Sequence, residues 1–279
     1  MNQFKAVAAL SSKLYQQKYI QKGVHIHRAR AEAFFDTLLE QLFPQLQVKG
    51  PVHPTVQELY LDLNKTQQEL NFLLRNIEPD ATRERIYTVT ENFFDALCGI
   101  TDQLEQDVDF AFQCDPASET RDQIIICYPG FYALSAYRIA NYFYKNKVPV
   151  FPRLISEYAH RKTGIDINPG ATIDAPFFTD HGTGLVIGET SHIGKRVRIS
   201  QNVTLGAISV YKELQSQKRH PTIEDDVHIY SNCTILGGKT VIGRGSIIES
   251  NVWITRSVPP NTRVSQVKKN SEEVSTKSG

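Results

Sequence analysis

The chain has 279 residues, enough for one or two domains of the usual ~100–200 residues. Lysine and arginine total 31 against 30 aspartates and glutamates, so the formal net charge is +1 at pH 7. This balance gives no cationic footprint for nucleic acid or for an anionic membrane, and neither partner is expected. No apolar run approaches the ~18 residues of a membrane span, and the short apolar patch after residues 1–5 does not predict a secretory signal.

The cysteines indicate a reducing environment. Cys98, Cys114, Cys127 and Cys233 form no CxxC pair and show no spacing typical of a disulfide framework. Free thiols are the rule in cytosolic proteins. We therefore expect four unpaired cysteines and a cytoplasmic location.

The pattern up to residue 162 is helical. Residues 31–43 place apolar side chains at i, i+3, i+4 and i+7, and Pro44 ends this helix. A second helical run opens at residues 54–56 and closes before Pro79, and a third begins near Thr82 and continues through Ile100. These residues predict an all-α N-terminal domain over residues 1–162.

Two prolines interrupt the later helices. Residues 114–117 break the series because the residue before a proline is pushed out of the α region, and Pro129-Gly130 makes a second break. Residues 131–144 then form an aromatic-rich amphipathic pattern, which favours packing against another helix over a ligand-binding box. One more short helix, residues 153–161, leads to Gly164.

The second half of the chain repeats every six residues. Aliphatic anchors recur at Ile187, Ile193, Ile199, Leu205, Ile223, Ile229 and Ile235, and after a one-residue slip at Ile242, Ile248 and Ile254. Small or β-branched residues follow four positions later at Ser191, Val197, Val203, Val227, Cys233, Ser246, Val252 and Val258. Sandwich strands alternate with period two and would not keep this phase.

A parallel β-helix explains the six-residue period. Each hexapeptide forms one flat face, three faces complete a coil, and the anchors stack into a continuous core. Gly188, Gly194 and Gly243 follow their anchors, and we expect them to supply a positive φ at the turns. The phase fails between Leu205 and Ile223, so residues 207–221 are predicted to loop out of the coil, where sites are often built.

Seven short motifs carry a resemblance to a known family. They are Asp115-Pro116-Ala117, residues 130–139 (GFYALSAYRI), residues 166–171 (DINPGA), residues 180–184 (DHGTG), Gly188-Glu189-Thr190, residues 201–206 (QNVTLG) and Arg219-His220-Pro221. Together they resemble the serine O-acetyltransferase family over about residues 115–260. The resemblance implies an α+β fold: a helical domain, a left-handed parallel β-helix over residues 163–262, and a polar tail over residues 263–279 that we expect to be disordered.

The activity that this resemblance implies is transfer of acetyl from acetyl-CoA to the hydroxyl of L-serine, which supplies cysteine biosynthesis. An alcohol attacks a thioester only when a base with a pKa near the working pH removes its proton, and histidine suits this role. By resemblance, His181 is the base and Asp166 is the carboxylate that fixes its tautomer. The two are fifteen residues apart, so a coil of ~18 residues can bring them near one corner on adjacent coils.

The resemblance also implies the substrate contacts. Asp115 and Asp180 lie near the amino group and hydroxyl of serine, Arg219 binds its carboxylate and His220 lies beside it. The planar guanidinium of arginine suits a carboxylate because it donates two parallel hydrogen bonds. The turns expected to hold CoA carry Gly206, Ala207, Ser231 and Asn232, and no metal is expected.

Assembly and regulation follow from the same resemblance. The family implies a homotrimer or a dimer of trimers, with L-cysteine as a possible feedback inhibitor. This sequence departs from the family at Asn168, where many relatives have histidine, and at Tyr230-Ser231, where glycine and alanine are common. It also ends at Gly279 and not at the isoleucine that docks into O-acetylserine sulfhydrylase. Docking through residues 270–279 is therefore not expected.

Three alternatives stay open from the sequence. The acceptor hydroxyl could belong to homoserine or to a sugar, although a sugar would not need the pairing of Asp115 with Arg219. A metal-dependent β-helix hydratase needs three converging histidines, and His181, His192, His220 and His228 show no such pattern. A non-catalytic scaffold would have no reason to keep the acidic, histidine and arginine motifs.

Overall fold

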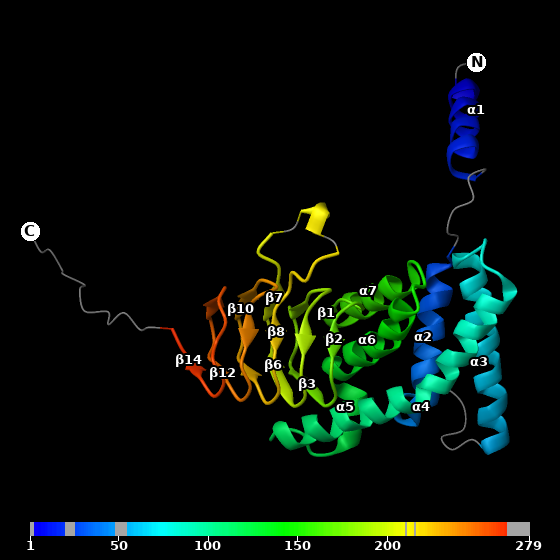
Figure 1. The fold of residues 1–279 in the computed structure, drawn as a ribbon. Helices are drawn as coiled ribbons and strands as arrows, with labels where there is room; N and C mark the ends of the chain where they lie inside the picture. Colours follow the sequence, from blue (N-terminus) through cyan, green and yellow to red (C-terminus); the bar gives the residue numbers. More distant parts are fainter. Residues whose placement is uncertain (1–2, 20–25, 48–54, 210, 215, 267–279) are drawn as a thin grey trace, which may run out of the picture. The chain divides into compact units, whose positions relative to one another are not determined.

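The computed structural model describes residues 3–19, 26–47, 55–209, 211–214 and 216–266 (Figure 1). The chain divides into two compact units: residues 1–98 with 142–155, and residues 99–141 with 156–279. Helices therefore contribute to both units. The predicted boundary at residue 162 falls where the last helix gives way to the first strand; as a domain boundary it stays a prediction.

The helices agree with the predicted breaks. They are α1 (Gln3–Leu14), a π-helical turn (Tyr15–Tyr19), α2 (Arg28–Leu42), a 3-10 turn (Pro44–Leu46), α3 (Val56–Ile77), α4 (Arg83–Cys114), α5 (Arg121–Cys127), α6 (Pro129–Lys145) and α7 (Phe151–Thr163). Helix α2 ends before Pro44, α3 ends before Pro79, and α4 ends at Cys114, so the proline signals are confirmed. The sequence did not indicate α5 as a separate helix.

The first unit is held together by helix capping and aromatic packing. Helix α3 begins with a capping box, in which the Glu58 N–H donates to Thr55 Oγ1 (3.2 Å) and the Thr55 N–H donates to Glu58 Oε2 (2.8 Å). Phe93, Phe143 and Phe151 are fully buried, with ring centroids 4.6 Å apart for the first pair and 5.0 Å for the second. These are the aromatics of the 131–144 pattern and its neighbours, and they pack against helices as expected.

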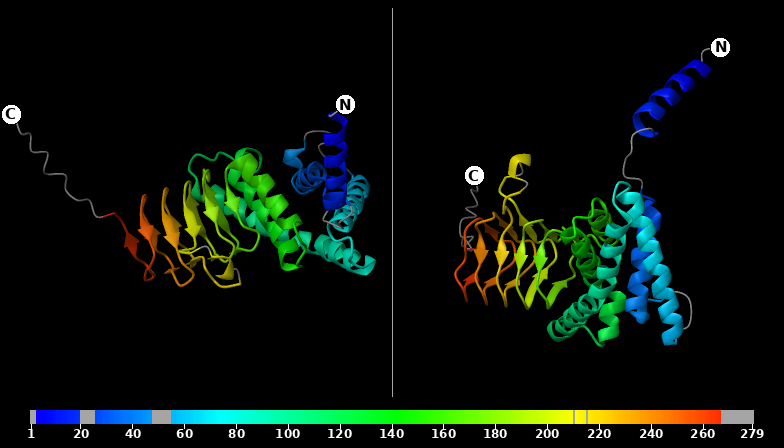
Figure 2. Two further views of the ribbon diagram at one scale, coloured as in Figure 1. Left: turned by 90° about the horizontal axis from the view of Figure 1, so that it is seen from above. Right: turned by 45° about the vertical axis from the view of Figure 1, so that its right-hand side comes forward.

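Fourteen short strands form three parallel sheets in the second unit (Figure 1). The strands are β1 (Asp166–Ile167), β2 (Thr172–Ile173), β3 (Phe177–Asp180), β4 (Val186–Ile187), β5 (His192–Ile193), β6 (Val197–Ser200), β7 (Thr204–Gly206), β8 (Thr222–Ile223), β9 (His228–Ile229), β10 (Thr234–Leu236), β11 (Val241–Ile242), β12 (Ile247–Ile248), β13 (Trp253–Ile254) and β14 (Arg263–Val264). Sheet A is β1-β4-β7-β10-β13, sheet B is β2-β5-β8-β11, and sheet C is β3-β6-β9-β12-β14. The chain passes through A, B and C in turn, which is the predicted β-helix, and Figure 2 shows its stacked coils.

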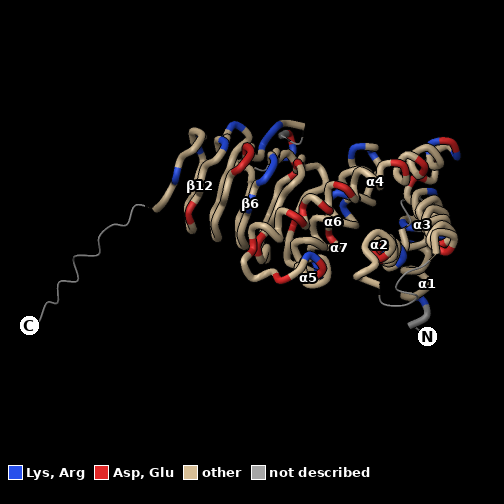
Figure 3. The backbone as a smooth tube through the Cα atoms, turned by 90° about the horizontal axis from the view of Figure 1, so that it is seen from below, with Lys and Arg blue, Asp and Glu red and all other residues tan. Residues whose placement is uncertain are grey.

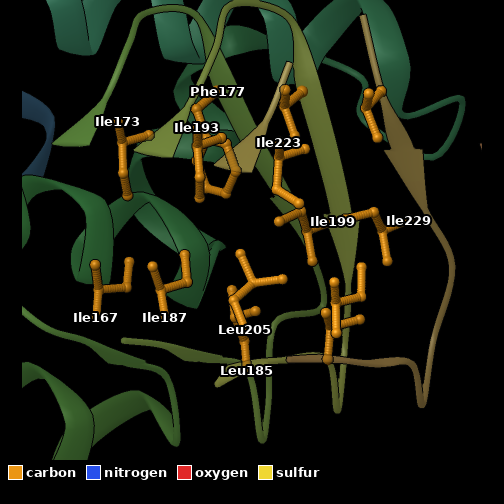
Figure 4. Packing of buried hydrophobic residues seen from close by; sticks show 14 of the residues in the cluster. Ile167, Ile173, Phe177, Leu185, Ile187, Ile193, Ile199, Leu205, Ile223 and Ile229 are labelled. Carbon is orange, nitrogen blue, oxygen red and sulfur yellow. The ribbon is translucent and has the colours of Figure 1, made fainter. Parts of the chain in front are cut away.

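The repeating anchors form the core of the β-helix. The strand register pairs Ile167 with Ile187 and Ile187 with Leu205 in sheet A, so equivalent anchors lie above one another. All ten predicted anchors are buried, and Figure 4 shows rows of aliphatic side chains that include Ile187, Ile193 and Ile199. The small residues of the second series complete the corners, with Ser191, Cys233 and Ser246 fully buried.

The predicted role of three turn glycines is wrong. Gly188, Gly194 and Gly243 do not have a positive φ; they are glycines because another coil approaches too closely. A Cβ on Gly188 would lie 1.9 Å from the His220 ring, and one on Gly243 would lie 2.4 Å from Pro260 N. Positive φ values occur instead at other glycines and at several residues with side chains, among them four asparagines: Asn202, Asn232, Asn251 and Asn261. Asparagine tolerates the left-handed region better than most residues.

A buried ion pair fixes helix α6 to the first coil. Arg138 and Asp107 have side chains only 3% exposed, and the guanidinium donates two hydrogen bonds of 2.7 and 2.8 Å to the carboxylate. Asp107 also accepts from the Phe177 N–H (2.8 Å), and Tyr137 Oη bridges the first coil by donating to Ala171 O and accepting from the Ile173 N–H. Burial raises the pKa of Asp107 and the arginine opposes this effect.

The structure also describes the interruption of the β-helix and its last strand. Between β7 and β8, the described residues leave the coil and include a 3-10 turn at Lys212–Leu214, as the lost phase predicted (Figure 1). Arg263–Val264 form β14, which pairs with β12, so the β-helix extends into the segment expected to be a polar tail. Residues 267–279 lie outside the described residues.

The composition agrees with the structure in two respects. Acidic and basic residues lie close to one another in both units (Figure 3), as the balanced charge suggests. All four cysteines are free, as expected. Among the described residues, no helix has the length and apolar character needed to span a membrane.

We expect Arg138→Met to destabilise the chain by about 3–5 kcal/mol, because it leaves the Asp107 carboxylate buried without a cation. Urea unfolding at a fixed protein concentration measures this loss. The matched control is Arg121→Met, whose exposed pair with Asp109 should contribute no more than ~0.5 kcal/mol. The double variant Asp107→Leu/Arg138→Met should recover part of the stability; equal losses in the two single arginine variants would contradict the prediction.

Candidate active site

His181 lies in the turn where the chain passes from sheet C to sheet A. It follows β3, has a φ of +58°, and exposes 75% of its side chain. A positive φ is uncommon for a residue other than glycine and often marks a functional position. The following Gly182 also has a positive φ, and a Cβ there would lie 2.5 Å from Ile165 Cδ1. The turn therefore presents the imidazole outward from a tightly packed corner.

Two carboxylates predicted to bind serine lie beside His181. Asp180 Oδ1 is 3.8 Å from His181 Nε2. Asp115, just after α4, accepts hydrogen bonds from the Tyr128 hydroxyl (2.5 Å) and the Ala117 N–H (2.8 Å). Burial raises the pKa of Asp115, but these hydrogen bonds and the nearby positive charges outweigh burial and hold the pKa below its usual range. Asp115 is therefore an ionised acceptor at neutral pH.

Sequence reasoning missed two residues of this cluster. Arg198 on β6 donates from Nη2 to Asp180 Oδ2 (2.9 Å) and from Nη1 to the carbonyl oxygen of Cys114 (3.0 Å). Tyr128 holds Asp115, and burial together with this carboxylate raises the pKa of Tyr128 to about 12. In the sequence, Arg198 occupies an outward-facing position of its hexapeptide. Any solvent-exposed arginine could stand there, so this position did not mark Arg198 as a site residue.

Asp166 lies on β1 and groups with two residues of α7. Its carboxylate groups with Glu157 and His160, with one potential ligand atom of each within 4.8 Å of the others. His160 Nδ1 is 3.4 Å from Glu157 Oε2. The ion pair found for His181 in the described chain is with Asp180. The pairing of Asp166 with His181 stays a prediction.

The Glu157, His160 and Asp166 group could offer one nitrogen and two carboxylates to a metal ion. Such groups are common at half-exposed positions without an ion. The histidines of the hydratase alternative do not form a comparable group within the described part of one chain. They lie in the turn after β3 (His181), on β5 (His192), before β8 (His220) and on β9 (His228).

Arg219 and His220 lie where the chain passes from sheet A to sheet B. The guanidinium of Arg219 is paired with Glu189, and Thr190 Oγ1 accepts hydrogen bonds from the Arg219 and His220 N–H groups at 2.9 and 3.0 Å. Lys218 Nζ donates to the carbonyl oxygens of Thr190, His220 and Pro221. The return of the 207–221 segment is therefore fixed to the preceding coil.

His220 is a neutral hydrogen-bond donor in this arrangement. Burial, followed by the positive charge of Arg219, lowers the pKa of His220 to about 4. Its Nδ1 accepts the Thr190 N–H at 3.1 Å, so the neutral ring carries its proton on Nε2. The side chain can donate this proton in a hydrogen bond at neutral pH.

The residues expected to bind CoA occupy both of these edges. Gly206 ends β7 and Ala207 follows it at the passage from sheet A to sheet B, and a Cβ on Gly206 would lie 2.8 Å from Leu236 Cδ2. Ser231 and Asn232 lie in the turn from sheet C to sheet A, below His181, where Asn202 Nδ2 donates to Asn232 Oδ1 (3.1 Å). Binding of CoA by these four residues stays a prediction.

The predicted site residues of one chain are therefore divided between two edges of the three-sided β-helix. Asp115, Asp180 and His181 gather at the C-to-A edge, whereas Arg219 and His220 gather at the A-to-B edge. Sheet A lies between them: its strands β4, β7 and β10 run from one edge to the other, with His181 paired to Asp180 and Arg219 to Glu189.

Comparisons with known proteins agree with this fold. No protein-family model matches the sequence. Over 206 residues the chain is 45% identical to "Serine acetyltransferase, plasmid" of Synechococcus elongatus; the match covers 72% of this chain and 64% of that relative. A serine acetyltransferase of Bacillus subtilis is 45% identical over 156 residues, which are 56% of this chain and 70% of the relative. The chain thus spans just under two thirds of the first relative.

Solved structures give the same result over more of the chain. Serine acetyltransferase 1 of Entamoeba histolytica, in complex with L-cysteine, has a TM-score of 0.75 at 30% identity and covers 92% of this chain and 97% of its own. The Vibrio cholerae serine acetyltransferase has a TM-score of 0.60 at 26% identity, covering 86% and 90%. These likenesses confirm the predicted fold class. The chain belongs to the serine acetyltransferase family.

Proposed function

We propose that this chain transfers an acetyl group from acetyl-CoA to the hydroxyl of L-serine, giving O-acetyl-L-serine and CoA for cysteine biosynthesis. The observation that carries the proposal is the cluster of His181, Asp180 and Asp115 at one turn of the β-helix. It combines an exposed imidazole with two carboxylates, which are the groups that a hydroxyl nucleophile on an amino acid requires.

The reaction proceeds by direct attack. His181 takes the proton of the serine hydroxyl as the serine oxygen bonds to the thioester carbon. The C–S bond then breaks, and the imidazolium returns the proton to the CoA thiolate, so no acyl-enzyme forms. Asp166 is proposed to stabilise the imidazolium, as a carboxylate does in other histidine-based sites. The steps need only proton transfer and acyl transfer, and we propose no metal.

Serine is bound by its two charges. Asp115 and Asp180 take the ammonium and the hydroxyl, and Arg219 takes the carboxylate with His220 as a neutral donor beside it. Arg219 is paired with Glu189 here, and the substrate carboxylate would compete with Glu189 for the guanidinium.

A complete site requires two copies of the chain. The residues proposed to bind the serine ammonium lie at the C-to-A edge, and Arg219, proposed to bind its carboxylate, lies at the A-to-B edge. One copy alone would therefore not present both groups to one serine. Sheet A between them presents Val186 and Trp253 to solvent, with Trp253 70% exposed. We propose that the C-to-A edge of one copy meets the A-to-B edge of the next in a homotrimer or a dimer of trimers.

The same packing would give acetyl-CoA a groove between copies. Gly206 and Ala207 would come from one copy, and Ser231 and Asn232 from the other. L-cysteine is proposed to compete for the serine site, because the structure of the Entamoeba relative contains it. We propose a cytoplasmic location from the free thiols. Residues 270–279, on which the doubt about sulfhydrylase docking rests, lie outside the described residues.

The first experiment measures release of CoA thiol from acetyl-CoA with L-serine, L-homoserine and a panel of sugars as acceptors. We expect release with L-serine alone, and a loss of at least about a hundredfold in kcat for His181→Ala, because the general base is removed. His192→Ala, on sheet B, is the control and should keep wild-type activity. Release with homoserine or a sugar but not serine would show another acceptor.

Mixing variants tests the shared site. His181→Ala and Arg219→Ala should each be nearly inactive alone. After unfolding and reassembly together, sites that combine a native His181 edge with a native Arg219 edge should return about a quarter of wild-type activity, as random assembly of a cyclic oligomer predicts. Refolding each variant alone is the control. No recovery in the mixture would mean that both residues act within one copy.

A further inference from the structure

We propose that Arg198 is a positioning residue that joins the Cys114–Asp115 segment to Asp180, so that Asp180 Oδ1 and the hydrogen-bonded carboxylate of Asp115 form one pocket for the substrate ammonium beside His181. This inference rests on the proposed function, because it assigns Asp115 and Asp180 to the ammonium of serine.

Arg198 bridges two segments that are distant in the sequence. Its Nη1 reaches the carbonyl oxygen of Cys114 at the end of α4 (3.0 Å), and its Nη2 reaches Asp180 Oδ2 at the end of β3 (2.9 Å). A planar guanidinium can donate in two fixed directions at once, which a lysine ammonium on a flexible stem does less well. The bridge therefore sets the separation between Asp115 and Asp180.

The bridge also orients Asp180. Arg198 occupies Oδ2, and the other oxygen, Oδ1, is the one 3.8 Å from His181 Nε2. A carboxylate free to rotate could direct either oxygen to the histidine or to the substrate. With Oδ2 engaged, Oδ1 faces the place where the serine hydroxyl must approach the base.

The charges of the pocket match one ammonium. Asp115 is ionised because hydrogen bonds from Tyr128 and Ala117 lower its pKa, and Asp180 is paired with Arg198. The neighbouring groups are neutral at pH 7: burial raises the pKa of the Cys114 thiol, burial and Asp115 raise that of Tyr128 to about 12, and burial and Arg198 lower that of His228 to about 4. Two carboxylates and one guanidinium leave a single negative charge.

The environment of Arg198 supports a fixed role. Its side chain is 25% exposed and Asp180 is 20% exposed, so the pair is partly desolvated and less screened than a surface pair. The Phe178 ring lies 5.6 Å from the guanidinium carbon. Arg196, two residues earlier, makes a comparable two-bond pair with Asp226 but is about half exposed and distant from the cluster in register. It provides a matched control.

The test uses the full chain with Arg198→Met, Arg198→Lys and Arg196→Met. Steady-state kinetics give kcat and the KM for each substrate. In parallel, diethyl pyrocarbonate modification of His181, followed by peptide mass spectrometry across pH, gives the midpoint of its reactivity without requiring catalysis. Arg198→Gln replaces the methionine variant if that protein does not fold.

We expect Arg198→Met to raise the KM for L-serine about tenfold, the effect of losing one charge-assisted contact, with the KM for acetyl-CoA within about twofold. The pH at which the diethyl pyrocarbonate reactivity of His181 reaches half its maximum should rise, because removal of a nearby cation favours the protonated imidazole. Arg198→Lys should restore the midpoint but only part of the serine KM. Arg196→Met should match wild type in both measurements.

An unchanged serine KM and an unchanged midpoint in Arg198→Met would overturn the inference. Equal rises in both KM values with an unchanged midpoint would also overturn it, because they indicate a general structural role. If the wild type released no CoA with serine, the proposed function would fail, and the midpoint alone would decide whether Arg198 acts on His181.

Discussion

Stacking of coils in register is the constraint on which the rest of this structure depends. Each anchor in sheet A lies directly on the anchor one coil away, as Ile187 does on Ile167 and on Leu205. A shift of one residue would turn every anchor of a coil from the core to solvent. The register therefore also fixes which turn residues share an edge, and it places His181 in line with the Asn202 and Asn232 corners.

The stacked core holds the two groups of predicted site residues, at the C-to-A edge and at the A-to-B edge, in fixed positions on opposite sides of sheet A. The sheets are hydrogen-bonded from coil to coil, so neither edge can move toward the other without breaking the ladder. Where the chain returns to the coil before β8, residues 218–221 are tied to the preceding coil by Thr190 and by the Lys218 ammonium. This rigidity supports the proposal that two copies of the chain together complete one substrate site.

Much of the fold was predictable because its signals are local and repeated. The six-residue period identified all ten anchors, and prolines marked the ends of helices. The turn glycines were misread because sequence shows the absence of a side chain but not its cause: at Gly188 the cause is the His220 ring, thirty residues away. Asp107 and Arg138 were missed for the same reason, since neither has a signature until α4 and α6 meet the first coil.

The sequence indicated the site residues that belong to short motifs. It did not indicate residues whose role depends only on the neighbours that the fold gives them. His181, Asp180 and Asp115 were found from motifs, and the structure brings them together. Arg198 was not found, because nothing in its own hexapeptide distinguishes it from Arg196. Asp166 was assigned to His181 by resemblance, and that pairing stays a prediction; its grouping with Glu157 and His160 of α7 is one that no β-helix repeat could have indicated.

Three arginine–aspartate pairs in this chain show how burial changes the use of the same chemistry. Arg138 with Asp107 is fully enclosed, so every donor and acceptor must be satisfied by the protein and the pair can serve only the fold. Arg196 with Asp226 is open to water and screened by it. Arg198 with Asp180 lies between these limits: it is desolvated enough to hold its geometry, and it leaves one carboxylate oxygen open to a ligand. A substrate-binding charge in a rigid β-helix needs that intermediate exposure, because a fully buried aspartate could not reach the substrate and a fully exposed one would not stay in place.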